Sequence, residues 1–316
     1  MRILLSFVLF VFFQSVLVGQ VATDLPEKEA TLIQLSKQFL KDSIKENRIK
    51  AAQSFSTTLE EVIAQENSFQ YPFSELETIS ILYPADSTFR IFTWQIYVDK
   101  NDYRYGGLIQ LNNPKNQYFV LTDQSAEIQP YDMEYEVLSS EDWYGAIYFN
   151  LKGFDTPTGK QYLLFGFDGY EFFNKRKVAE VLYFDESGQP TFGAPTFAKV
   201  AEGYEASTKN RLYLEYSAEV AARLNYDSNM DMIIMDNLIS MRSPYRGVGN
   251  VNIPDGSYEG YQLKDGVWVY LEKVFHTVSE EPPAPRRVFD DKNPKDLFGK
   301  KAKKRDKNVP MRNSKH

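Results

Sequence analysis

Short apolar and aromatic runs, each followed by a turn-forming pair of residues, recur through the middle of the chain. Runs of this length that are rich in Val, Tyr and Phe and precede Gly-containing turns are typical of antiparallel strands joined by hairpins. The clearest examples are Tyr144–Leu151 before Lys152-Gly153, Gln161–Phe167 before Asp168-Gly169, and Val178–Phe184 before Ser187-Gly188. The pattern predicts a meander of paired strands.

The same pattern extends on both sides of this stretch. It predicts further strands at Phe89–Val98, Tyr103–Leu111, Gln117–Leu121, Arg211–Tyr216, Val220–Tyr226, Met232–Met235, Tyr258–Leu263 and Val267–Leu271. Lys264-Asp265-Gly266 indicates a tight hairpin, and the three glycines of Gly247–Gly256 indicate a long loop. We therefore predict a mainly β fold, an antiparallel meander over residues 76–278 arranged as a propeller, a sandwich or a barrel.

Residues 20–75 have a helical pattern instead. Apolar residues recur at three- and four-residue steps from Leu32 to Ile44, which indicates an amphipathic helix packed on its own domain. Leu59, Val62 and Ile63 indicate a second, short helix. Thr57 and Thr58, each followed three residues later by glutamate, are capping-box candidates for its start.

The two ends of the chain differ in composition from residues 20–278. Arg2, an apolar run over residues 3–13 and the small residue Gly19 have the layout of a secretory signal peptide over residues 1–19. The apolar run is too short to span a bilayer and no later one is longer, so we expect no transmembrane span in the mature chain. Residues 279–316 are Pro-rich and then Lys-rich, which predicts a disordered tail.

Composition narrows the possible chemistry. The chain has no cysteine, which excludes disulfides, thiol nucleophiles and Cys-ligated metals, and its two histidines lie at residues 276 and 316. A Ser-His-Asp arrangement would need a histidine inside the body. Residues 20–281 contain 23 basic and 39 acidic residues, and residues 282–316 contain twelve basic and four acidic residues. An acidic body repels phosphate, so we expect no nucleic acid as a partner.

Carboxylates remain as candidates for catalysis. Asp168 and Glu171 flank an aromatic turn, and Asp185 follows a predicted strand. A pair of carboxylates beside aromatic residues is the arrangement that a glycoside hydrolase uses as acid and as base or nucleophile. Acidic turns between strands are also common in any acidic β protein, so the sequence leaves both interpretations open.

One segment resembles the start of a calcium loop. Asp227, Asn229 and Asp231 place oxygen-bearing side chains at alternate positions. Met232 occupies the position where such a loop needs glycine, and no glutamate lies six residues further on. An Asp/Asn-rich hairpin turn explains the segment without a metal, and a bound calcium ion is the alternative.

The tyrosines, phenylalanines and tryptophans, with Trp94, Trp143 and Trp268 among them, allow two interpretations: an exposed platform on which sugars or peptides stack, or burial in the core. The basic run over residues 300–307 likewise allows contact with an anionic surface or simple solvation.

Three phrases together resemble a family of secreted Bacteroidota proteins to which no activity is assigned: residues 162–195, 211–236 and 260–274. The resemblance covers roughly residues 80–275. It implies a Gram-negative envelope setting, in the periplasm, at the cell surface or in the medium, and it brings no catalytic or binding residues.

These observations give three hypotheses. The first is a non-enzymatic envelope protein, without a cofactor, that binds another envelope protein or a surface polymer. The second is a carboxylate-dependent hydrolase acting on glycans through Asp168, Glu171 and Asp185. The third is a structural module stabilised by calcium at Asp227, Asn229 and Asp231.

Overall fold

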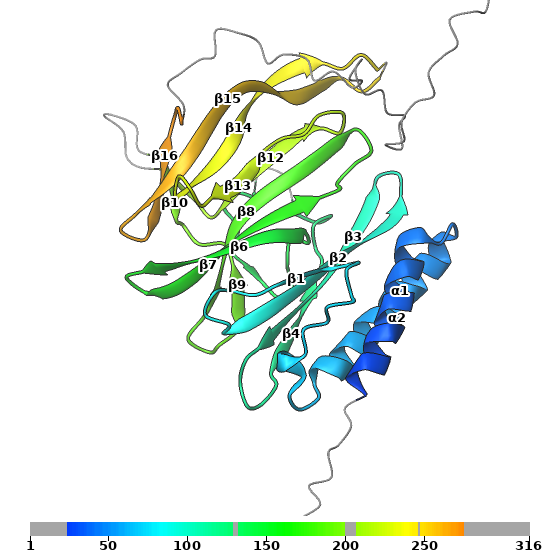
Figure 1. Ribbon diagram of the computed structural model, residues 1–316. Coiled ribbons are helices and arrows are strands. Elements are labelled where there is room, and N and C mark those ends of the chain that lie inside the picture. The colour runs from blue at the N-terminus through cyan, green and yellow to red at the C-terminus, as the bar shows by residue number, and fades with distance from the viewer. Residues whose placement is uncertain (1–23, 129–131, 200–206, 246, 275–316) are drawn as a thin grey trace, which may run out of the picture. The chain divides into compact units, whose positions relative to one another are not determined.

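The computed structural model describes residues 24–128, 132–199, 207–245 and 247–274. The predicted signal peptide and the predicted C-terminal tail lie outside the described residues. Within them, two helices near the N-terminus precede a mainly β body, as the sequence predicted. Figure 1 shows this order along the chain.

The helices α1 (Leu25–Lys41) and α2 (Lys45–Ile63) pack against each other, and the 3₁₀ turn η1 (Ser68–Gln70) follows them. The prediction of a short second helix was wrong, because Thr57 and Thr58 lie inside α2 and do not begin it. Ala51, Ala52 and Phe55 continue the buried stripe toward the N-terminus of α2. Two of these three are alanines, whose weak hydrophobicity concealed the stripe in the sequence.

The strands form three sheets. The first has the order β1 (Ser80–Leu82), β2 (Phe89–Asp99), β3 (Asp102–Leu111) and β4 (Tyr118–Thr122). The second has the order β5 (Leu138–Ser139), β9 (Pro190–Phe192), β8 (Asn174–Phe184), β7 (Gly159–Asp168) and β6 (Ile147–Thr156), with β12 (Arg211–Ser217) paired to β8. The third has the order β11 (Ser207–Lys209), β10 (Phe197–Lys199), β16 (Val267–Leu271), β15 (Asn250–Lys264), β14 (Met232–Arg242) and β13 (Leu224–Asp227).

Alternate side chains of β2 and of β7 face opposite cores, because successive residues of a strand point to opposite sides of its sheet. In β2, Phe92 and Trp94 pack with the helices, whereas Phe89 and Ile91 pack with the second sheet. In β7, Leu164 joins that same core, while Leu163 and Phe165 join the core shared with the third sheet. The helices and the three sheets are therefore stacked layers that share cores, and within the described residues no sheet closes into a barrel.

Most hairpin turns lie where the turn residues predicted them. Asp265 and Gly266 both have positive φ and join Lys264 to Val267, as a two-residue hairpin loop requires. Two turn predictions were wrong. Gly153 lies inside β6, opposite Tyr162, and most of Gly247–Gly256 belongs to β15, where Asn250 to Pro254 pair with the outer half of β14.

The connections also depart from a simple meander in two places. Strand β10 pairs with β16 in parallel, and β12 pairs with β8, which precedes it by almost thirty residues. These pairings join parts of the chain that no local turn links. All three tryptophans are buried: Trp143 and Trp268 are 0% exposed and Trp94 is 3% exposed, so the stacking-platform interpretation was wrong for the tryptophans.

Gly106 allows the indole of Trp94 to lie on the backbone of β3. A Cβ at this position would lie 2.2 Å from Cε2 of Trp94. We expect Gly106→Ala to lower the free energy of unfolding by about 1–3 kcal/mol, because the buried indole has to move. Gly153→Ala is the matched control, since its Cβ would have 3.4 Å to the nearest atom. Chemical denaturation of both variants checks this, and equal stability of the two would contradict it.

Candidate functional site

Three hairpin ends from three sheets meet at one end of the stacked layers. They are the turn between β2 and β3, the turn between β7 and β8, and the loop between β14 and β15 (Figure 1). The backbone N–H of Phe172 donates to Oδ1 of Asn101 at 3.0 Å, which joins the first two. The rings of Phe173 and Tyr245 lie 5.7 Å apart, which joins the second and third.

A cavity of about 250 Å³ lies between the first two hairpin ends and the segment that follows β4. Its lining mixes hydroxyl, amide, carboxylate and guanidinium groups with tyrosine rings. The residues are Asn101, Asp102, Tyr103, Ser125, Ala126, Ile128, Asp168, Tyr170, Glu171 and Arg176.

Asp168 is the most strongly hydrogen-bonded residue of this cavity. It ends β7 and is only 3% exposed. Its Oδ1 accepts from the hydroxyl of Tyr105 at 2.8 Å and from the N–H of Tyr170 at 2.7 Å, and its Oδ2 accepts from the hydroxyl of Tyr144 at 2.6 Å. Burial, and then the Asp168 charge, raise the pKa of both tyrosines well above its usual value. Asp168 is thereby fixed in place as an acceptor.

Arg176 lies opposite Asp168 in the β7–β8 ladder and is also 3% exposed. Its Nε and Nη2 both donate to Glu215 on β12, at 3.0 and 2.9 Å. Its guanidinium lies 3.2 Å from the centroid of the Tyr170 ring. Burial would lower the pKa of Arg176, but Tyr144, Tyr213 and Glu215 outweigh burial, and the pKa is raised. The charge of Arg176 is therefore already balanced within the protein.

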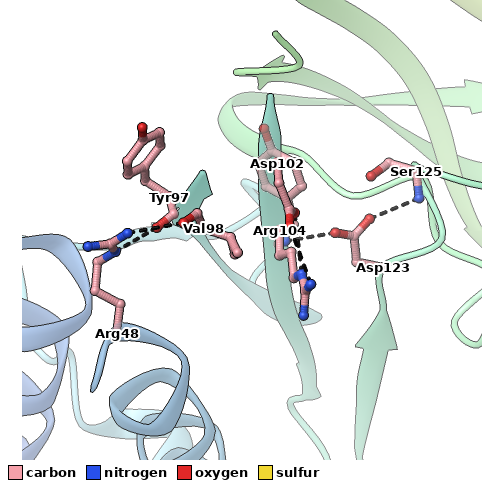
Figure 2. Close-up of polar contacts among 8 residues, drawn as sticks. Arg48, Tyr97, Val98, Asp102, Arg104, Asp123 and Ser125 are labelled. Atoms are coloured by element: carbon pink, nitrogen blue, oxygen red, sulfur yellow. Dashed lines mark hydrogen bonds and ion pairs between the residues drawn. The ribbon is translucent and has the colours of Figure 1, made fainter. Parts of the chain in front are cut away.

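A larger groove of about 780 Å³ adjoins the cavity and has five lining residues in common with it: Asn101, Asp102, Tyr103, Ser125 and Ala126. It lies between α2 and strands β3 and β4, with Trp94 in its lining. Figure 2 shows Arg48 reaching from α2 to the carbonyl oxygens of Tyr97 and Val98, at 2.7 and 3.1 Å. These bonds fix the helix against the strand and so fix the width of the groove.

On the other side of the groove, Asp123 accepts from the backbone N–H groups of Tyr105 and Ser125, at 2.8 and 2.9 Å (Figure 2). Burial raises the pKa of Asp123, and hydrogen bonds from Ser125 and Tyr105 oppose the shift. Arg104 contacts Asp102 at 3.4 Å. The charged groups that line the groove are thus also engaged within the protein.

Glu171 is the exception. Glu171 lines the cavity, and within the residues that the structure describes its carboxylate makes no hydrogen bond or salt bridge and interacts with Lys175 only through its charge. Nζ of Lys175 donates to the backbone oxygens of Gly169 and Glu171, the first at 2.8 Å, and lies 4.9 Å from the Tyr103 ring centroid. Burial lowers the pKa of Lys175.

The structure brings two of the three candidate catalytic carboxylates together. Asp168 and Glu171 line the same cavity, whereas Asp185 follows the opposite end of β8. Nine residues separate Arg176 from Asp185, which is roughly 30 Å along a strand. Asp185 is exposed and organises the β8–β9 turn by accepting from Ser187 and from the N–H of Gln189, which lower its pKa. Asp185 is a turn residue and lies outside the cavity.

Asp227, Asn229 and Asp231 lie in the hairpin between β13 and β14. Oδ1 of Asp227 accepts from the N–H groups of Asn229 and Met230, and Oδ2 accepts from Arg223 at 2.8 Å. Asp231 accepts from the hydroxyl of Tyr226. No group of three or more acidic or histidine side chains suited to a metal ion is found among the described residues. The geometry is that of an Asp/Asn-rich turn, and calcium binding stays an untested hypothesis.

Sequence inspection did not identify Arg176, Tyr105 or Tyr144 as site residues. Arg176 stands between Lys175 and Lys177 at the start of β8, so the local sequence suggests an exposed basic run and gives no signal of a buried arginine. Its partner Glu215 lies 39 residues away, and the pairing of β8 with β12 brings the two together.

Comparison with known protein families, with curated proteins and with solved structures finds no match for this chain. Fold and site alone therefore define the class: a mainly β protein with a polar cavity and an adjoining groove at its hairpin ends. In the part of the chain that the structure describes, no helix is both long and apolar enough to cross a bilayer.

Proposed function

We propose that the protein is a non-enzymatic binding module of the bacterial cell envelope. The cavity and its adjoining groove are the binding surface, and the ligand is an uncharged, hydroxyl-rich surface polymer. One observation carries the proposal: the buried charges of the cavity are compensated inside the protein, Asp168 by three donors and Arg176 by Glu215.

Compensated charges suit a neutral ligand. A buried carboxylate whose two oxygens already accept three hydrogen bonds is held by the protein and is poorly placed to attack a ligand. Sugar hydroxyl groups both donate and accept, which matches a lining of carboxylates, amides and hydroxyls. The envelope setting is supported by the signal-peptide pattern of residues 1–19.

A carboxylate-dependent glycan hydrolase is the second candidate. It is favoured by the position of Glu171, which lines the same cavity as Asp168. A retaining or inverting mechanism needs two carboxylates on opposite sides of a glycosidic bond. Loss of sugar-releasing activity in Glu171→Gln would support this second candidate over the first.

A bulky side chain in the cavity should weaken ligand binding without unfolding the protein. Ala126 is exposed and lines both cavity and groove, so its substitution by tryptophan occupies the space that the ligand needs. We expect Ala126→Trp to weaken binding of neutral oligosaccharides at least about tenfold, since a ligand held in this volume loses most of its contacts. Calorimetric titration with neutral glucan and mannan fragments measures the effect.

The matched control is Ala64→Trp, another exposed alanine, at the C-terminal end of α2 and outside the groove. Both variants should keep the melting temperature of the wild type. Undiminished binding by Ala126→Trp would show that the ligand binds elsewhere. Failure of the wild type to bind any neutral fragment would refute the proposed function.

A further inference from the structure

Each of the three hairpin ends presents one aromatic ring to solvent. Tyr97 of β2 is 44% exposed, Phe172 of the β7–β8 turn is 52% exposed, and Tyr245 of the β14–β15 loop is 49% exposed. Large apolar side chains that are exposed together in one region mark a surface that another molecule covers.

These three rings are held in place although they are exposed. The guanidinium of Arg48 lies 5.2 Å from the Tyr97 ring centroid, and Nζ of Lys100 lies 4.8 Å from that of Phe172. The hydroxyl of Tyr245 donates to Oε1 of Glu219 at 2.7 Å. A ring that is already fixed binds a ligand with little loss of side-chain entropy, so the three rings are preorganised for binding.

The three exposed rings are also connected to the cavity through residues that line it. Tyr103 lines both cavity and groove, and its ring lies 5.5 Å from that of Tyr97. Asn101 lines the same cavity and accepts from the N–H of Phe172. Phe173 packs on Phe172 at 4.9 Å and on Tyr245 at 5.7 Å. Contacts between neighbouring side chains therefore lead from the groove past the cavity to the tip of the β14–β15 hairpin.

Resting on the binding function proposed above, we infer that the ligand is an extended neutral polysaccharide, several of whose sugar units bind at once. One unit occupies the cavity, and neighbouring units stack on the aromatic rim formed by Tyr97, Phe172 and Tyr245. The C–H face of a pyranose ring is apolar and covers an aromatic face, while its hydroxyl groups remain at the edge, in contact with water.

Charge favours this ligand over an anionic polymer. Residues 20–281 contain 39 acidic and 23 basic residues, so the net charge of the body repels an anionic chain. A neutral chain avoids this repulsion, and it gains contact area with each added unit.

The test is a titration with ladders of neutral glucan and mannan, comparing monosaccharide, trisaccharide and hexasaccharide. Affinity should rise with length, and Phe172→Ala and Tyr245→Ala should each weaken hexasaccharide binding about 3- to 10-fold. Neither variant should change the binding of the monosaccharide, because the cavity is intact. Phe172→Trp keeps an aromatic ring and should retain the affinity for the hexasaccharide.

Tyr135→Ala is the control. Tyr135 is 50% exposed and lies beside Asn210 and near Gly193, at the other end of β8 from the rim. Equal affinity for monosaccharide and hexasaccharide, or full hexasaccharide affinity in the two rim variants, would overturn the inference and leave the proposed function standing. Absence of saccharide binding at any length would overturn both.

Discussion

Arg211→Met is expected to lower the free energy of unfolding by about 3–5 kcal/mol, because it leaves a buried carboxylate without its counter-charge. Arg211 and Glu180 face each other across β12 and β8, and both side chains are 0% exposed. Nε of Arg211 donates to Oε2 of Glu180 at 2.7 Å. The other oxygen of Glu180 accepts from the hydroxyl of Tyr148, which in turn accepts from the Trp143 indole at 2.7 Å.

The matched control is Lys28→Met, which removes an ion pair with Glu61 whose side chains are 33% and 59% exposed. An exposed pair contributes about 0–1 kcal/mol, so this variant should stay close to wild type. In the double variant Arg211→Met/Glu180→Met both charges are absent, and the combined loss should be smaller than the sum of the two single losses. Equal effects of Arg211→Met and Lys28→Met in chemical denaturation would show that the β8–β12 pair is hydrated.

The second large effect is expected at alkaline pH: the protein should unfold cooperatively between pH 10 and 12. Tyr105, Tyr144 and Tyr148 are buried, and the pKa of each is raised well above its usual value of about 10, first by burial and then by Asp168 or Glu180. Above pH 10 these hydroxyls ionise in the unfolded chain but stay protonated in the folded one. Folding stability is therefore fully present below pH 10 and is lost as the pH rises above it.

Above pH 10, each of these three tyrosines lowers stability with a limiting slope of about 1.4 kcal/mol per pH unit for as long as its hydroxyl stays protonated in the folded chain. The three contributions add, so stability should fall more steeply with pH than one buried tyrosine would produce. Denaturant unfolding at a series of pH values gives the slope, and tyrosinate absorbance gives the ionisation. Tyrosinate could instead form gradually from pH 10 while the circular dichroism stays constant. The hydroxyls of Tyr105, Tyr144 and Tyr148 would then be accessible to base, which would contradict their burial.

Part of the candidate site could be predicted from the sequence. The Asp168-Gly169 turn and the nearby Glu171 were recognised as a possible site, and both carboxylates do line the cavity. Asp185 was grouped with them because it also follows a strand, but antiparallel strands place successive turns at opposite ends of a sheet. Register, which the local sequence does not show, decided which turn residues meet.

The buried charges illustrate the same limit. Arg176 with Glu215 and Arg211 with Glu180 are separated by 39 and 31 residues, and each pair is aligned by the β8–β12 ladder. The residues next to these arginines in the sequence do not indicate which glutamate each arginine pairs with. The ladder itself is one of the two pairings that depart from a simple meander, so the partners could not be predicted from neighbouring hairpins.

The local structure of this protein follows from short-range patterns in its amino-acid sequence. Alternating apolar residues specified the strands, and pairs such as Asp265-Gly266 specified hairpins, because side-chain alternation and positive φ are properties of a few adjacent residues. The meeting of three hairpin ends at one cavity, and the internal compensation of Asp168 and Arg176, became visible only in three dimensions. Those features depend on packing between layers and on strand register, which join residues far apart in the chain.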